Sequence, residues 1–194
     1  MPHSLALLLT WMGDARLVAP VMLVLGWQWW RRNPRLALEA AVAVSGMIGL
    51  LVVSKLAYKA AGIDWRTIGF FTISGHSALS ALLYPLLCYS LAEGARPGVR
   101  HASLALGVCV ALAIAISRVL TYRHTPVEIM VGLALGLTVG GLLLRRWHGE
   151  MALPARALPW MAGALMAAGL VVWMAPHVSA ERVLSHIAWR LQNS

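Results

Sequence analysis

Long, uninterrupted apolar runs constrain the fold of this chain more than any other feature of its sequence. Two of these runs, residues 102–116 and 129–144, flank a short polar segment, residues 117–128. A helix needs roughly 20 apolar residues to cross a bilayer, where only helices and closed barrels satisfy their backbone hydrogen bonds. The apolar residues are continuous rather than alternating, which excludes a barrel. The chain is also 60% hydrophobic and only 12% charged, so the sequence predicts an integral membrane protein made of helices.

The apolar runs predict a single membrane-embedded domain, residues 1–194, built as an all-α bundle of about six transmembrane helices. The expected spans are residues 17–30, 36–58, 75–91, 102–120, 126–144 and 160–175. Residues 4–12 are apolar but too short to span, so we expect an N-terminal helix at the membrane interface. Residues 180–191 place their apolar side chains on one side, which predicts a C-terminal amphipathic helix on the membrane surface.

The positions of the arginines predict the orientation of this bundle. Loops after the first, third and fifth expected spans carry Arg31, Arg32, Arg35, Arg96, Arg100, Arg145, Arg146 and Arg156. Cytoplasmic loops of membrane proteins are enriched in Arg and Lys, so we expect both termini and the polar segments to face outward. We therefore expect a multi-pass protein of a bacterial inner (cytoplasmic) membrane whose polar segments face the periplasm.

The net charge of +9 does not indicate a nucleic-acid partner. The basic residues lie in short loops without a basic stripe or interleaved aromatic residues, so topology and anionic lipid explain them better. Cys88 and Cys109 lie within apolar runs and imply neither a disulfide nor a metal framework. The expected partner is the lipid bilayer, and small residues in the spans allow close helix contacts within one chain or in a homo-oligomer.

Three polar segments at the ends of expected spans form, in our interpretation, one phosphate-handling site: residues 59–66, 72–76 and 117–128. In the second, Ser74 is a good N-cap for the third span, and Gly75 lets another group approach the free amides of the helix N-terminus, which bind anions. His76 in that first turn can donate or accept a proton beside a bound anion. The alternative is an ordinary capped helix with an interfacial histidine.

Lys59 and Arg66 form the cationic part of the first polar segment. Arg66 can supply the forked donors that a phosphate needs, and Lys59 can add a second positive charge. The alternative is that both side chains are membrane headgroup anchors. Lys55 lies one helical turn before Lys59, and we expect it to extend its amine to the membrane interface rather than to serve the site.

The third polar segment places Arg118 beside an expected helix end and pairs His124 with Glu128 four residues later. A carboxylate at this spacing can hold the imidazole through its Nδ1–H and leave Nε2 as a nucleophile. Thr125 to Glu128 also fits a capping box, in which Glu128 simply closes the start of the helix. Both roles can coexist, but we expect that one carboxylate cannot fully satisfy both geometries.

Together the three segments resemble the motifs of the type-2 phosphatidic acid phosphatase superfamily, which includes lipid phosphate phosphatases and vanadium haloperoxidases. The family pattern is Lys-x6-Arg-Pro, then Pro-Ser-Gly-His, then Ser-Arg-x5-His-x3-Asp. This chain has Lys59-x6-Arg66-Thr67, Ile73-Ser74-Gly75-His76 and Ser117-Arg118-x5-His124-x3-Glu128. Thr67 and Ile73 thus replace prolines, and Glu128 stands in place of an Asp with one methylene more.

The resemblance implies a role for each matching residue. His124 would form a phosphohistidine, Glu128 would orient it, and His76 would protonate the leaving oxygen. The phosphoryl oxygens would be held by Lys59, Arg66, Ser74, Arg118 and the amide of Gly75. No metal or other cofactor is implied. Arg123 lies outside the shared pattern and is a candidate substrate contact, with an interfacial anchor as the alternative.

The resemblance implies a membrane lipid phosphatase, a hydrolase of phosphate monoesters or diphosphates that works without metal. Its substrate would be a lipid phosphate, and undecaprenyl diphosphate is the first expectation because the site is expected to face the periplasm. Lipid A 1-phosphate and phosphatidylglycerophosphate are alternative substrates. A lipid-to-lipid phosphotransferase and a non-catalytic lipid transport or binding protein remain as alternative functions, although a transporter would more often carry charges at the centres of its spans.

Overall fold

The computed structural model describes residues 3–174 and 180–192 of the chain, and this part is helical apart from loops and one isolated bridge between Trp65 and Phe70. Its elements are α1 (His3–Met12), α2 (Ala15–Trp30), α3 (Pro34–Ala61), the 3-10 turn η1 (Arg66–Ile68), α4 (Gly75–Ala92), α5 (Pro97–Leu120), α6 (Pro126–Trp147), α7 (Ala157–Met174) and α8 (Ala180–Gln192).

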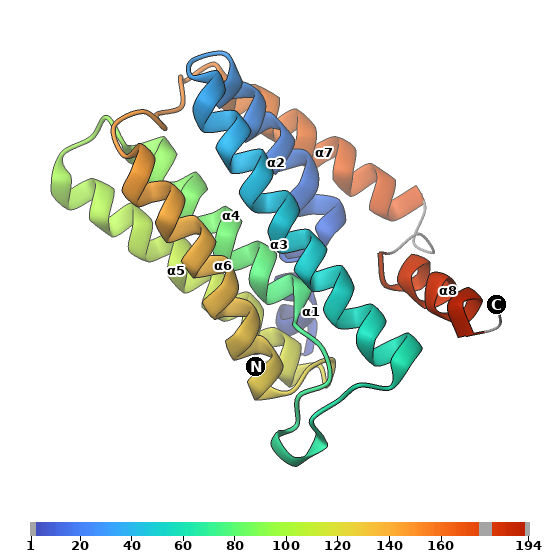
Figure 1. Cartoon of the computed structure of the whole chain (residues 1–194). Helices are drawn as coiled ribbons and strands as arrows, with labels where there is room; N and C mark the ends of the chain where they lie inside the picture. Colours follow the sequence, from blue (N-terminus) through green and yellow to red (C-terminus); the bar gives the residue numbers. More distant parts are fainter. Residues whose placement is uncertain (1–2, 175–179, 193–194) are drawn as a thin grey trace.

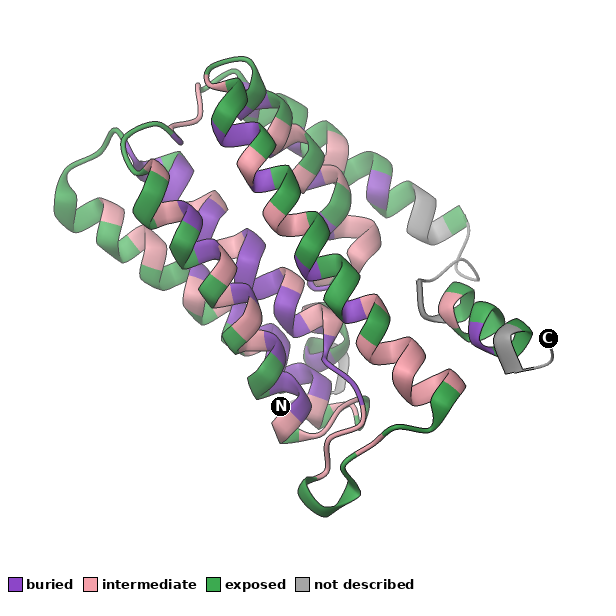
Figure 2. Cartoon of the chain, viewed as in Figure 1, coloured by how far each residue is buried: buried purple, intermediate pink, exposed green. Residues whose placement is uncertain are grey.

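Helix α4 lies at the centre of the bundle. It packs against α5 and α6 on one flank and against α2 on the other, while α2 also packs against α3 and α7 (Figure 1). Eleven of the 18 residues of α4 are buried, and Figure 2 shows this helix as the most continuously buried one. The apolar core lies where α2, α3, α4 and α7 meet and includes Leu25, Trp29, Leu36 and Leu82.

Two glycines allow α5 and α6 to approach α4 closely. A Cβ atom on Gly107 of α5 would lie 2.5 Å from the carbonyl oxygen of Tyr84, and one on Gly136 of α6 would lie 2.2 Å from that of Ala78. Both distances are shorter than van der Waals contact, so any larger residue would push the helices apart. Close approach through small residues is a common way for membrane helices to pack, and here it holds the starts of α4 and α6 next to each other.

Three helices, α3, α5 and α6, are long and apolar enough to cross a membrane among the residues that the structure describes. The pair formed by α1 and α2, which is bent by 41° at its break, would make a fourth if it forms one span. The apolar stretch Ala157–Leu170 of α7 is shorter than these three helices. The all-helical membrane fold is therefore supported, whereas the predicted count of six spans is not confirmed. Helix α4 is not among these three, and its buried serines Ser77, Ser80 and Ser90 lower its apolar character.

Helices α1 and α8 form at the two ends of the chain, close to where the sequence predicted short helices. Helix α1 packs against α5 and α2, and α8 packs against α3. The connection between α1 and α2 is fixed by Tyr84, whose hydroxyl donates to the carbonyl oxygen of Met12 at 2.8 Å, and by a 2.9 Å bond between Thr10 and Ser117. That these helices lie at the membrane interface stays a prediction.

Candidate active site

Two cavities meet at His124, where the C-terminal ends of α3 and α5 lie near the N-terminal ends of α4 and α6. The first, about 590 Å³, lies between α3 and the turn before α6 and is lined by His124, Glu128 and Lys59 among others. The second, about 420 Å³, reaches His76, Arg118 and the connection between α1 and α2. Lys55, Arg123 and His124 line both cavities. The three polar segments thus converge on one region of the bundle.

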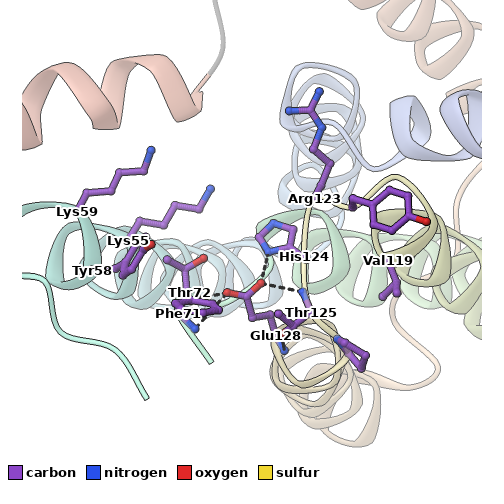
Figure 3. A pocket seen from close by; sticks show the side chains of 12 residues that line it. Lys55, Tyr58, Lys59, Phe71, Thr72, Val119, Arg123, His124, Thr125 and Glu128 are labelled. Atoms are coloured by element: carbon purple, nitrogen blue, oxygen red, sulfur yellow. Dashed lines mark hydrogen bonds and ion pairs between the residues drawn. The ribbon is translucent and has the colours of Figure 1, made fainter. Parts of the chain in front are cut away.

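His124 is held by Glu128. Nδ1 of the imidazole lies 2.8 Å from Oε2 of the carboxylate, and only 11% and 5% of the two side chains are exposed (Figure 3). Low exposure strengthens such a pair because water does not screen it. With Nδ1 engaged, Nε2 is the ring nitrogen that can act on a substrate in the cavities.

Glu128 also caps its own helix, so the expectation that one carboxylate cannot satisfy both geometries was wrong. Its Oε2 accepts from the backbone amide of Thr125 at 3.0 Å, and Thr125 completes a capping box by accepting from the Glu128 amide through its hydroxyl. The other oxygen, Oε1, accepts from the amides of Thr72 at 2.8 Å and Phe71 at 3.2 Å. Each carboxylate oxygen has two lone pairs, and together they serve four donors.

The same contacts fix the segment that leads into α4. Besides the two bonds to the Glu128 side chain, the Ile73 amide donates to Ser54 Oγ at 3.1 Å, and the Ser74 amide donates to the Glu128 carbonyl at 3.3 Å. Consecutive residues before the helix are therefore tied to α3 and α6. These bonds hold the loop at the position where the family pattern has a proline and this chain has Ile73.

The turn between α5 and α6 folds back over the end of α5. The carbonyl oxygen of Arg118 accepts from the amides of Arg123 at 3.0 Å and His124 at 3.3 Å, and Tyr122 takes the left-handed backbone conformation with φ of 53°. The Thr121 hydroxyl donates to the Ser117 carbonyl at 2.8 Å. This turn brings the buried Arg118 side chain and the imidazole of His124 to the same cavity, as the sequence predicted.

At the start of α4, Gly75 and His76 line the second cavity. Ser74 is the N-cap of the helix, but its side chain is fully buried and its Oγ accepts from the Ser77 hydroxyl at 2.9 Å. Ser74 therefore lies beneath the cavity wall rather than in it. Nothing lies within 4 Å of the position that a Cβ on Gly75 would take, so a ligand can approach this helix N-terminus closely.

Of the two cationic residues predicted in the first polar segment, the structure places Lys59 at a cavity and Arg66 away from both cavities. Lys59 lines the first cavity and donates to Ser185 Oγ of α8 at 2.7 Å. Arg66 lines neither cavity: its side chain is 81% exposed and its Nε lies 2.9 Å from Asp64 Oδ2. The hydrogen bond to Asp64 raises the pKa of the Arg66 guanidinium, so it stays charged but outside the two cavities.

Lys55 is the residue that the sequence interpretation placed incorrectly. We expected it to extend to the membrane interface, yet it lines both cavities with His124. It lies one helical turn before Lys59, so the two side chains share a face of α3. Figure 3 shows both lysines on the α3 side of the first cavity, with His124 and Arg123 across from them.

The sequence interpretation also missed the connection between α1 and α2. Asp14 and Arg16 form a pair, with Nε to Oδ1 at 3.0 Å, and both line the second cavity. Next to them, a Cβ on Gly13 would lie 3.3 Å from Cδ2 of His76 and 2.6 Å from Cγ2 of Ile114. A charge pair between two apolar segments was the signal that could have pointed to this contact.

Among the described residues, no group of three or more His, Cys, Asp or Glu is placed to hold a metal ion.

Comparisons with known proteins identify the family of this chain. An uncharacterized 22.5 kDa protein in the cps region of Klebsiella pneumoniae is 30% identical over 144 residues, which cover 71% of this chain and 66% of that protein. No solved structure matches. The family model of the PAP2 superfamily matches residues 56–152, a range that contains all three motifs. The resemblance drawn from those motifs is thereby confirmed: the chain belongs to the PAP2 superfamily.

Proposed function

We propose that this chain is a membrane-embedded lipid phosphatase that works through a phosphohistidine on His124. Membership of the PAP2 superfamily indicates a phosphatase of lipid phosphates. The observation that carries the mechanism is the buried 2.8 Å contact between His124 and Glu128 at the junction of two cavities. It fixes the imidazole with one nitrogen engaged and the other available for attack.

In the first step, Nε2 of His124 attacks the phosphorus atom in line with the leaving oxygen. The N–P bond forms as the P–O bond breaks, and His76 gives its proton to the leaving oxygen. Glu128 accepts the hydrogen bond from Nδ1–H throughout and stabilises the positive charge that develops on the ring. In the second step, His76 takes a proton from water, the water oxygen attacks phosphorus, and the N–P bond breaks to return His124 and release phosphate.

The phosphoryl oxygens would be held by the cations that line the cavities, Lys55, Lys59, Arg118 and Arg123, and by the amide of Gly75 at the N-terminus of α4. Donors aimed at developing negative charge are the largest contribution in reactions of this kind. Arg66 would take part only if it left Asp64. We therefore assign the phosphate-holding role to Lys55 ahead of Arg66.

Within this class of reaction we propose a lipid diphosphate, with undecaprenyl diphosphate as the first candidate and a periplasm-facing site in a bacterial inner membrane. Two cavities that share three cationic or catalytic residues leave room for two phosphoryl groups, which supports a diphosphate. Lipid A 1-phosphate and phosphatidylglycerophosphate are the alternatives, and the orientation rests on the arginine-rich loops.

The test is phosphate release by the purified protein in detergent with EDTA. The substrates are undecaprenyl diphosphate, phosphatidylglycerophosphate, phosphatidic acid and lipid A, and wild type is compared with His124→Ala. His101→Ala is the matched control, because His101 is exposed on α5 and lines neither cavity. We expect release that needs no metal, is abolished in His124→Ala and is unchanged in His101→Ala.

If no lipid is hydrolysed, or if His124→Ala is as active as wild type, the hydrolytic mechanism is wrong. The same reaction mixtures would then be analysed for phosphoryl groups moved onto a second lipid. Such transfer would indicate a phosphotransferase, and lipid binding without either reaction would indicate a transport or binding protein.

A further inference from the structure

We propose that the groove between α2 and α3 binds the hydrocarbon chain of the lipid substrate. This inference rests on the proposed function and adds to it the place where the apolar part of the substrate lies. The groove is a cavity of about 560 Å³ lined almost entirely by apolar side chains of α2 and α3.

Small residues on the two facing helices leave the groove open. Ala15, Ala19 and Gly26 line it from α2, and Ala37 and Ala41 line it from α3. Nothing lies within 4 Å of the position that a Cβ on Gly26 would take. Larger residues at these positions would bring α2 and α3 into full side-chain contact, so the sequence itself keeps space between them.

The groove adjoins the phosphate-handling region. Ala15, Ile48 and Leu79 line both the groove and the cavity that contains His76, Arg118 and His124. A cationic cavity that contains His76 and His124 and an apolar groove therefore lie side by side. An occupant with a phosphate at one end and a hydrocarbon chain at the other matches both, whereas a protein helix or a free phosphate matches only one.

The length of the groove suits a long chain. It follows α2 from Ala15 to Trp30, and the 16 residues of this helix extend about 24 Å at 1.5 Å per residue. This is most of the hydrocarbon thickness of a bilayer, roughly 30 Å. Trp27 and Trp30 line the groove at the C-terminal end of α2, away from Ala15.

The experiment compares two phosphatidic acids that share a headgroup but differ in chain length, one short and one long. Gly26→Leu places a branched side chain into the groove, whereas Gly46→Leu makes the same change on α3 at an exposed glycine that lines neither the groove nor the two cavities. Both changes replace a helical glycine by a good helix former, so neither is expected to unfold the chain.

We expect Gly26→Leu to lower the ratio of kcat/KM for the long chain to that for the short chain by about tenfold, mainly through KM. The leucine would displace contacts worth about two methylene groups. Gly46→Leu should leave the ratio as in wild type. An equal ratio in all three proteins would overturn the proposal.

A second measurement separates the groove from the proposed function. A phosphatidic acid with a photoreactive group in its chain is cross-linked to wild type and to Gly26→Leu, and the labelled peptides are identified. Label on α2 and α3 that falls in Gly26→Leu supports the groove even if wild type hydrolyses neither substrate, in which case only the proposed function fails. Label on other helices, or label unchanged by Gly26→Leu, overturns the groove whatever the activity.

Discussion

Replacing Glu128 by Gln tests the central contact of the site by exchanging one carboxylate oxygen for an NH2 group. The carboxylate accepts from four donors: Nδ1 of His124 and the amide of Thr125 on one oxygen, and the amides of Thr72 and Phe71 on the other. A glutamine amide has one oxygen and one NH2 group. Whichever way it is turned, the NH2 group faces hydrogen-bond donors.

The magnitude follows from these contacts. A hydrogen bond to a charged group contributes about 1.5–3 kcal/mol. If the NH2 group of the introduced glutamine faces His124, losing that bond in the transition state lowers kcat/KM roughly 10- to 150-fold. If the amide turns the other way, two backbone amides that were satisfied lose their acceptor, at about 1–3 kcal/mol each in stability. We therefore expect Glu128→Gln to lose activity, stability or both, beyond what the loss of one charge on the surface would cause.

The assay measures kcat/KM for the best lipid substrate together with the thermal unfolding midpoint in detergent. Glu39→Gln is the matched control, because Glu39 accepts from Arg146 and Trp147 and lines none of the three cavities. It should keep wild-type activity. Glu128→Gln with wild-type kcat/KM and an unchanged midpoint would refute the reasoning, because it would mean that the four donors do not need the carboxylate.

Three further predictions concern other parts of the fold. Lys55→Ala should lower kcat/KM roughly 100-fold, as loss of one donor to a developing oxyanion does, while Arg66→Ala, at an exposed pair, should change it less than about fivefold. Gly136→Ala should lower the unfolding midpoint strongly, because its Cβ would lie 2.2 Å from the Ala78 carbonyl oxygen. Gly141→Ala on the same helix, where nothing lies within 4 Å, should leave the midpoint equal or higher. Tyr84→Phe removes the bond to Met12 and should cost about 1 kcal/mol in the free energy of unfolding.

Each of these predictions has an outcome that contradicts it. Equal losses in Lys55→Ala and Arg66→Ala would mean that Arg66 reaches the phosphate despite its pairing with Asp64. Equal midpoints for Gly136→Ala and Gly141→Ala would mean that α4 and α6 are not in the close contact described. A wild-type unfolding free energy for Tyr84→Phe would show that the connection between α1 and α2 is not held by this bond.

The amino-acid sequence was sufficient to predict the class of fold and the local geometry at two helix starts of the site. Continuous apolar runs predicted helices in a membrane because a bilayer leaves few other choices for the backbone. Thr125 and Ser74 predicted the starts of α6 and α4, since a cap depends on residues within one turn. The pairing of His124 with Glu128 was also visible, because residues four apart near a helix start lie on one face.

Contacts between distant segments depend on how the helices pack and were not predictable from the sequence. The bonds from the amides of Phe71 and Thr72 to Glu128 join residues 57 and 56 positions apart, and no local pattern encodes them. The same holds for Gly13 lying against His76, and for the small residues between α2 and α3, which read as ordinary membrane helix composition until the two helices face each other.

The choice between Lys55 and Arg66 shows the physical reason most clearly. Both are cations near the same polar segment, and the family motif together with its forked donors favoured Arg66. The direction in which each side chain extends depends on the element that carries it: Lys55 extends from α3 into both cavities, whereas Arg66 follows the end of that helix and pairs with Asp64 in an exposed loop. Spacing predicts which residues are neighbours within one element, and packing of the elements decides which of them meet at the site.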